Sequence, residues 1–176
     1  MGILTPDMRR VVREQRLGYI ATVCADNTPN LSPKGTTTVW DDDHLVFADI
    51  CSPGTIENLR GNPAIEINVV DPIVRKGYRF KGRATVLDRG PRFSEIMDFY
   101  RHIHKLRPGL ADRVRHVVLV RVERVLPLVS PIYDLGETEE HVAAEYAAYY
   151  AALRTRGAGA AAGEWAQERR SHGGGR

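Results

Sequence analysis

Two short polar segments hold the residues of this 176-residue chain with the clearest chemical potential. Ser52-Pro53-Gly54-Thr55 combines two hydroxyls with a proline and a glycine, an order typical of the first turn of a helix. Such a turn presents free backbone N–H groups, and a glycine there lets an anion approach them closely. The segment predicts an anion site, although many helices begin this way only because the first turn needs a cap.

The other segment, Ser32-Pro33-Lys34-Gly35-Thr36-Thr37-Thr38, supplies a lysine, a glycine and four hydroxyls. We place it on a strand, and the hairpin that follows this strand leads into the predicted helix. The lysine offers a positive charge, and the hydroxyls offer hydrogen bonds to a polyhydroxyl chain. Together the two segments predict a phosphate site at one end of a polar strand.

A basic stripe is a third candidate. On one predicted strand, alternation places Arg79, Lys81 and Arg83 on the same face. Three like charges in a row are costly unless they are solvated or matched by acidic or phosphate groups. Two interpretations stay open: an anion site, or a solvent face or dimer interface paired with Glu66 or Glu123.

Other chemistry has little support in the sequence. The motifs G-x-S-x-G, G-x-G-x-x-G and H-E-x-x-H and the Walker loop are absent. His102 and His104 are two residues apart on a predicted helix, so they point in different directions and no metal is expected there. The aspartates at 41–43 indicate a solvated turn. Cys24 and Cys51 are too few for a disulfide framework and are expected to be small buried hydrophobes.

Composition and charge exclude some classes of protein. With 43% hydrophobic and 27% charged residues, and no apolar run near the roughly 20 residues of a bilayer span, no membrane protein is expected. The charged start does not resemble a signal peptide, so a cytoplasmic location is expected. Residues 1–153 carry 20 Lys and Arg against 20 Asp and Glu, which leaves the whole +3 surplus in the tail. A nucleic-acid partner is therefore not expected.

One globular domain is predicted over residues 1–156, and a disordered Gly- and Ala-rich tail over 157–176.

Helices are predicted over Pro6–Gln15, from Ser52 to the stop at Gly61-Asn62-Pro63, over Pro91–Lys105 and over Glu137–Leu153. Strands are predicted over Leu17–Ala25, Pro29–Val39, His44–Asp49, Ile65–Val70, Tyr78–Val86 and Val117–Leu126. Thr5 and Ser52 are expected to cap the first two helices, and the first three strands to form a meander. About six strands without a βαβ rhythm predict an α+β fold that is mainly β, an antiparallel barrel flanked by short helices.

The chain resembles the pyridoxamine 5′-phosphate oxidase-like flavoproteins of the FMN-binding split-barrel superfamily over about residues 5–135. The resemblance rests on Leu17-Gly18-Tyr19-Ile20-Ala21-Thr22-Val23, Asn30-Leu31-Ser32-Pro33-Lys34-Gly35, His44-Leu45-Val46-Phe47-Ala48-Asp49, Thr55-Ile56-Glu57-Asn58-Leu59-Arg60-Gly61-Asn62-Pro63 and Tyr78-Arg79-Phe80-Lys81-Gly82-Arg83-Ala84. It implies a six-stranded antiparallel split β-barrel of the Greek-key type. It also implies a homodimer with FMN at its interface and an oxidoreductase of unassigned small-molecule substrate, with NAD(P)H as a candidate electron donor.

Carried over position by position, the resemblance implies a cofactor site. The phosphate and ribityl chain would be lined by Ser32, Pro33, Lys34, Gly35, Thr36 and Thr37, the flavin by Ala48 and Asp49, and further contacts would come from Ser52, Thr55, Asn58, Arg79 and Lys81. The chain departs from the oxidase at the helix start, where Gly54 and Thr55 replace an Arg-Lys pair. The charge on the phosphate would then be met by Lys34, Lys81 or Arg79, or by an arginine of the second subunit.

The substrate and the activity stay open. The C-terminal Arg-x-His signature of the oxidase is missing, and Ser130-Pro131-Ile132-Tyr133-Asp134 stands there instead, which argues against pyridoxamine phosphate as substrate. One alternative on the same barrel is a deazaflavin-dependent reductase, whose longer cofactor has an acidic tail that could use the basic stripe. The other is a non-enzymatic flavin or haem carrier, sensor or storage protein. No side chain is nominated as a general acid or base, because the flavin N5 would carry the hydride.

Overall fold

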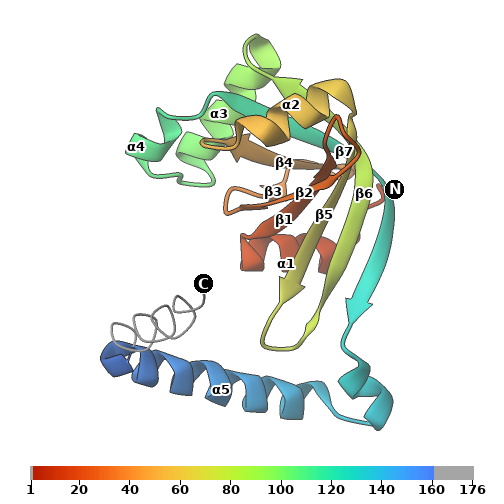
Figure 1. Ribbon diagram of the computed structural model, residues 1–176, viewed down its shortest axis with the longest axis vertical. Helices are drawn as coiled ribbons and strands as arrows, with labels where there is room; N and C mark the ends of the chain where they lie inside the picture. Colours follow the sequence, from red (N-terminus) through yellow and green to blue (C-terminus); the bar gives the residue numbers. More distant parts are fainter. Residues whose placement is uncertain (1, 161–176) are drawn as a thin grey trace, which may run out of the picture. The chain divides into compact units, whose positions relative to one another are not determined.

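The computed structural model describes residues 2–160. Contacts between the described residues divide them into two units (Figure 1), one formed by residues 2–71 together with Lys76–Val129, the other by Pro72–Arg75 together with residues 130–160. No helix within residues 2–160 has the length and the apolar run needed to cross a bilayer.

Within residues 2–160, seven strands form one curled antiparallel sheet in the spatial order β2-β1-β5-β6-β7-β4-β3. The strands are β1 (Gly18–Val23), β2 (Pro29–Lys34), β3 (Thr38–Val39), β4 (His44–Asp49), β5 (Ala64–Asp71), β6 (Lys76–Leu87) and β7 (His116–Val129). Together with the helices, the sheet confirms the predicted α+β class and is consistent with the split-barrel fold.

The sheet has seven strands because the single strand predicted over Pro29–Val39 is broken at Gly35–Thr37. At the break, the Thr36 hydroxyl accepts a hydrogen bond from the backbone N–H of Ala48 and donates one to its C=O, each at 3.0 Å. The Thr36 side chain thus makes the hydrogen bonds to β4 that a neighbouring backbone would make in an unbroken strand. Both hairpins of the predicted meander are present, because β1 pairs with β2 and β3 pairs with β4, but the middle strand that they share is broken. On their other sides, β1 pairs with β5 and β4 pairs with β7. The two edge strands, β2 and β3, are consecutive in the chain, so the curled sheet is joined at its edges by three residues.

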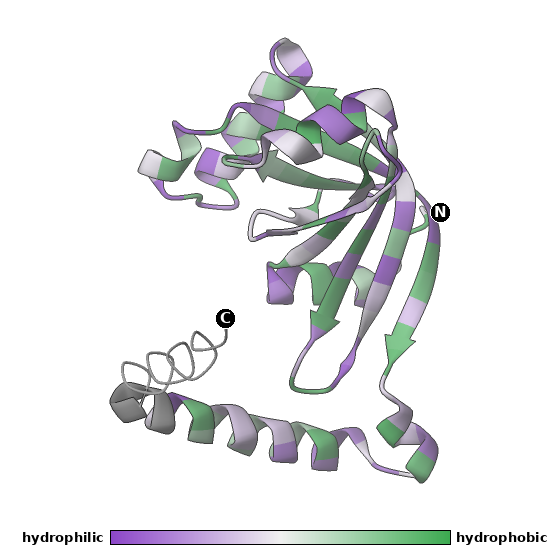
Figure 2. Ribbon diagram, in the orientation of Figure 1, coloured by the Kyte–Doolittle hydropathy of each residue, from purple (hydrophilic) through white to green (hydrophobic). Residues whose placement is uncertain are grey.

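The inner face of the sheet carries the main hydrophobic core. Ile20, Ile67 and Phe80 are fully buried and lie opposite one another across β1, β5 and β6. Leu45 and Phe47 join them from β4. Apolar and polar residues alternate along β5 and β6 (Figure 2), as expected for strands with one face in the core. This alternation determines which predicted site residues point inward.

Helices cover the sheet. α1 (Pro6–Gln15) has the predicted bounds, and Thr5 caps it by accepting a hydrogen bond from the Met8 N–H. α2 (Pro53–Gly61) follows β4, and α3 (Pro91–His102) packs against β4 and β7. The hydroxyl of Tyr100 on α3 donates to the C=O of Thr36 at 2.8 Å. α3 ends three residues before the predicted end, and the four-residue α4 (Pro108–Ala111) was not predicted.

The second unit contains the 3-10 helix η1 (Pro131–Leu135) and the helix α5 (Glu139–Ala160). The Tyr133 hydroxyl donates to the C=O of Val74 at 2.6 Å, and the Arg75 guanidinium lies 4.7 Å from the ring centre of Tyr146. α5 confirms the predicted C-terminal helix and continues past its expected end into residues 157–160. The rest of the predicted disordered tail, 161–176, lies outside the described residues.

Candidate functional site

The two polar segments meet at a buried lysine. Lys34 ends β2 and is 6% exposed, because alternation along the strand turns it and Ser32 toward the inner face. Its ammonium donates to the Ser32 hydroxyl at 3.0 Å and makes a short contact with the hydroxyl of Ser52, the residue before α2. The structure therefore brings the lysine-bearing strand and the start of the helix together, as the sequence predicts.

The predicted cap of α2 by Ser52 is wrong. The Ser52 hydroxyl makes no hydrogen bond to a backbone N–H of the helix and faces the Lys34 ammonium instead. A buried ammonium that lost a partner would cost more than an exposed N–H that water can solvate, so the hydroxyl is held by the lysine. The first turn of α2 is thereby left without a side-chain cap.

Asp49 is the carboxylate of the site. It ends β4, is 3% exposed, and accepts the backbone N–H of Ser52 at 2.9 Å. Its Oδ1 lies 3.9 Å from Lys34 Nζ, and its Oδ2 lies 3.5 Å from His116 Nδ1. We call Ser32, Lys34, Asp49, Ser52 and His116 the Lys34 cluster. Sequence reasoning missed His116, because only the pairing of Asp49 with the first residue of β7 reveals it.

The donors of the Lys34 cluster suit an anion. Burial lowers the pKa of Lys34, because desolvation disfavours the charged ammonium, while nearby Asp49 and Cys51 act in the opposite direction. Two N–H groups of the ammonium have hydroxyl acceptors, and for the third no acceptor lies within hydrogen-bond distance in residues 2–160. A Cβ added to Gly54 would meet no atom within 4 Å, so the first turn of α2 is open to approach. An ammonium, two hydroxyls and an open helix start form a donor set that fits a phosphate.

Other predicted residues near Lys34 are used inside the fold. The Thr36 hydroxyl is bonded to the backbone of Ala48, and the Thr37 hydroxyl donates to the C=O of Lys34 at 2.9 Å. Both threonines are buried, and Ala48 packs against α3. Because both hydroxyls are buried and already donate their protons to backbone carbonyls, the structure does not offer them to a ribityl chain as predicted. Gly35, between them and Lys34, is exposed.

A second polar group ties α2 to the sheet. The Thr22 hydroxyl accepts hydrogen bonds from the side-chain amides of Asn30 at 3.0 Å and Asn58 at 3.1 Å. The Asn30 amide also lies 3.4 Å from the hydroxyl of Thr55, and the Asn58 amide lies 3.5 Å from Cys24 Sγ. The predicted site residues Thr55 and Asn58 therefore hold the helix on β1 and β2.

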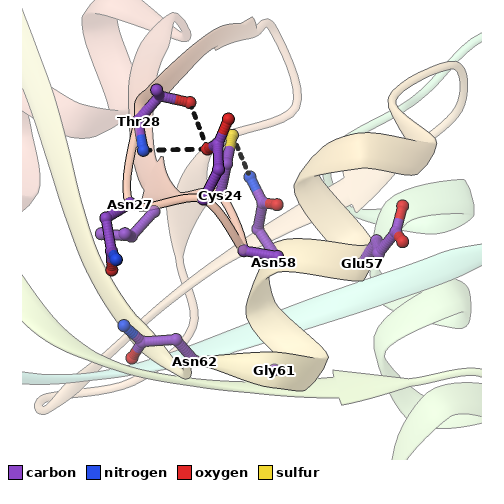
Figure 3. Close-up of a pocket in the computed structure, with 10 residues that line it drawn as sticks. Cys24, Asn27, Thr28, Glu57, Asn58, Gly61 and Asn62 are labelled. Carbon is purple, nitrogen blue, oxygen red and sulfur yellow. Dashed lines mark hydrogen bonds between the residues drawn. The ribbon is translucent and has the colours of Figure 1, made fainter.

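An open groove of about 690 Å³ lies at the C-terminal end of α2 (Figure 3). It is lined by the turn between β1 and β2 and by the end of the helix: Val23, Cys24, Ala25, Asp26, Asn27, Thr28, Glu57, Asn58, Gly61 and Asn62. Asn58 points from α2 toward Cys24 in this view. The lining carries two carboxylates and no cation, which disfavours a phosphate, so we place the candidate phosphate site at the Lys34 cluster.

The structure places the basic stripe away from that cluster. Arg79 and Lys81 point to the outer face of β6, where Glu66 of β5 lies 2.5 Å from Arg79 Nε and 3.3 Å from Lys81 Nζ. Glu66, one of the two acidic partners that the sequence offers, therefore neutralises part of the stripe. Pro33 is also exposed on the outer face. The residues predicted to share one cofactor are thus divided between the two faces of the sheet.

Cys51 overturns the prediction that both cysteines are buried. Cys24 is partly buried, whereas Cys51 is exposed where the chain leaves β4 for α2. The Nη2 of Arg113 donates to Cys51 Sγ at 3.2 Å. The exposed thiol thus lies next to Ser52 at the edge of the Lys34 cluster.

Comparisons with known proteins bear on the fold. The family model described as pyridoxamine 5′-phosphate oxidase matches residues 4–128. HupZ from Group A Streptococcus is 30% identical, with 73% of this chain and 96% of that chain covered and a TM-score of 0.64. No curated protein matches the chain.

More distant structures share the fold at lower identity. A proposed pyridoxamine 5′-phosphate oxidase from Lactobacillus delbrueckii is 23% identical, with 70% of this chain and 93% of that chain covered and a TM-score of 0.58. An FMN-binding protein from Syntrophomonas wolfei is 14% identical, with 70% and 86% covered and a TM-score of 0.57. An F420 reductase and the haem storage protein HutZ from Vibrio cholerae, each 19% identical, have TM-scores of 0.54 and 0.56.

Proposed function

The chain belongs to the pyridoxamine 5′-phosphate oxidase family, and from that premise we propose that it binds FMN and acts as a flavin-dependent oxidoreductase on a small molecule. The observation that carries the proposal is the contact of the Lys34 ammonium with the Ser52 hydroxyl at the open start of α2. A buried cation beside hydroxyls and the backbone N–H of Gly54 is the donor set that a phosphomonoester needs.

The residues of the Lys34 cluster would have different roles in holding the phosphate. Lys34 and Ser32 would donate to phosphate oxygens, while Asp49 holds the backbone of Ser52 in place. Burial of Lys34 strengthens its attraction to an anion, because less water screens the charge. When bound, the flavin supplies a hydride acceptor and donor at N5, and the protein supplies orientation and electrostatics.

We also propose a homodimer with the flavin at its interface. The outer face of β1 and β2 carries large apolar side chains in water, with Leu31 64% exposed and Tyr19 43% exposed. Clustered exposed apolar residues are typical of surfaces that a partner covers. Sedimentation with and without FMN tests this part, and a monomer that retains flavin tightly would contradict it.

The paired stripe weakens the deazaflavin alternative. That cofactor would use its acidic tail on the basic stripe, but Glu66 already pairs with Arg79 and Lys81. Binding of an acidic tail would have to compete with this carboxylate. We therefore favour FMN over the longer cofactor, and direct comparison of the two affinities checks the choice.

The decisive experiment is a titration of the purified protein with FMN, followed by flavin fluorescence and by the visible spectrum. We expect quenching or a spectral shift with FMN. An unchanged flavin signal, or a haem absorption band in the purified protein, would overturn the flavin assignment. Turnover of NADH or NADPH with bound flavin, against oxygen and quinones, then separates an oxidoreductase from a carrier.

A further inference from the structure

Two cations contact the short segment that joins β4 to α2. The Lys34 ammonium contacts the Ser52 hydroxyl, and the Arg113 guanidinium donates to Cys51 Sγ at 3.2 Å. Cys51 and Ser52 are neighbours in the chain, so both positive groups lie at the same short stretch of backbone. The segment leads directly into the first turn of α2.

Negative charge near this segment is scarce. Asp49 is the one carboxylate of the Lys34 cluster, and it is shared among the Lys34 ammonium, the Ser52 N–H and His116. Arg113 forms no ion pair with a carboxylate in the part of the chain that the structure describes. The nine-residue helix α2 adds the positive end of its dipole to the same place. Lys34, Arg113 and the start of α2 together carry more positive charge than Asp49 neutralises, and an anion would neutralise the rest.

Strand pairing explains how Arg113 reaches this place from a distant part of the sequence. Asp49, the last residue of β4, pairs with His116, the first residue of β7. The backbone N–H of Arg115 donates to the C=O of Asp49 at 3.1 Å, which continues the contact beyond the strands. The loop between α4 and β7 is thereby held against the start of α2, and Arg113 belongs to this loop.

We propose that Arg113, from the same chain, supplies the second positive charge for the phosphate of FMN; this inference rests on the proposed function. It meets the need left by Gly54 and Thr55, which stand where the resemblance places an Arg-Lys pair. A guanidinium binds phosphate with two parallel N–H groups, whereas the Cys51 thiol is a weak acceptor that phosphate oxygens would readily replace. The ligand class is a phosphomonoester dianion, and Arg113 is a binding residue.

Titration of wild type and Arg113→Ala with FMN and with riboflavin, which lacks the phosphate, tests the assignment. We expect Arg113→Ala to weaken FMN binding by roughly 10- to 100-fold, the usual effect of a lost charged hydrogen bond. Riboflavin binding should not change. Arg101→Ala, at an exposed arginine of α3, is the matched control and should bind FMN as wild type does. A urea denaturation curve shows that each variant is folded.

The outcomes separate the two proposals. If wild type does not bind FMN, the proposed function fails. If wild type binds FMN and Arg113→Ala binds it equally well, or loses riboflavin to the same extent, the assignment of Arg113 fails while the proposed function stands.

Alkylation of Cys51 gives an independent measurement, because the thiol is exposed and lies against the guanidinium. FMN should slow the reaction of Cys51 with iodoacetamide in wild type, and this protection should be lost in Arg113→Ala at the same FMN concentration. Peptide mass spectrometry reads the modified residue. Protection that persists in the variant would contradict the assignment.

Discussion

The Oδ1 atom of Asp49 accepts the backbone N–H of Ser52 at 2.9 Å, and this bond holds the start of α2 against the end of β4. The carboxylate thus fixes the backbone of Ser52, whose hydroxyl faces Lys34 instead of capping its own helix. A residue that the resemblance placed near a flavin is therefore one that holds together the Lys34 cluster.

Asp49→Ala should destabilise the protein by about 3 kcal/mol, because it removes a buried carboxylate next to a buried ammonium and leaves the Ser52 N–H without its acceptor. Urea denaturation at neutral pH measures the change. Asp49→Asn, which retains an oxygen acceptor in a side chain of the same size, should lose clearly less stability than Asp49→Ala. Equal losses in the two variants would show that the hydrogen bond to Ser52 contributes little.

Gly54→Ala should raise stability and weaken FMN binding. The added methyl meets no atom within 4 Å, and alanine is favoured over glycine in a helix by roughly 0.5 to 1 kcal/mol. The same methyl would stand where an anion approaches the backbone of the first turn. Thermal unfolding and FMN titration of one sample measure both effects, and undiminished affinity would remove the Gly54 backbone from the site.

Gly82→Ala should destabilise strongly. An added Cβ would lie 2.0 Å from the backbone oxygen of Arg121, beside the register shift between β6 and β7. Since a backbone atom cannot rotate away, the strands would have to separate, at a cost of about 3 kcal/mol. Urea denaturation measures the loss, with Gly61→Ala as the control, because a Cβ added at Gly61 would meet no atom within 4 Å. Similar midpoints would contradict the close approach of the two strands.

The stabilising contribution of Glu66 should be lost in acid. The hydrogen bond from Arg79, aided by Lys81, lowers the pKa of Glu66 below its usual value of 4.5, although burial opposes the shift. The carboxylate therefore contributes stability above pH 4.5, and this contribution is lost as the pH falls through the lowered pKa. Glu66→Gln should be less stable than wild type at neutral pH, and the difference should shrink in acid. Denaturation at stepped pH, with exposed Glu57→Gln as control, measures this.

His104 should add a second loss of stability at mildly acidic pH. Burial lowers its pKa below the usual 6.5, and the Arg16 guanidinium lowers it further. Between the lowered pKa and 6.5 the unfolded chain binds more protons, so stability falls as the pH falls through that window. His104→Gln should therefore lose less stability than wild type between about pH 7.5 and about pH 5. His102→Gln, at an exposed position, is the control, and parallel curves for all three proteins would refute the prediction.

Elements with strong local signals were predictable from the sequence. α1 has the expected bounds because Thr5, Pro6 and the apolar spacing all indicate the same start, and β4 was also correct. The break between β2 and β3 was not predictable, because Thr36 bonds to Ala48 across the sheet. A run of threonines favours a strand locally, and only this long-range contact interrupts it.

The candidate site was partly predictable. Lys34 and Ser52 stood out because each lies in a segment rich in groups that bind anions. His116 and Arg113 gave no local signal, since the pairing of β4 with β7 brings them to the site from more than sixty residues away. The charge of Arg79 and Lys81 makes them candidates for an anion site, but strand alternation turns them to the opposite face of the sheet from Lys34.

The residues that join the two edge strands, Gly35–Thr37, directly follow Lys34, so the connection between the edges of the curled sheet and the Lys34 cluster share one stretch of chain. Local opening of the sheet at this point would draw the lysine away from Ser52 and release the Tyr100 bond to Thr36. A molecule held at the cluster would oppose such opening. Amide protons of β2 and β3 should then exchange with solvent more slowly in its presence, which makes hydrogen exchange a direct reporter of occupancy.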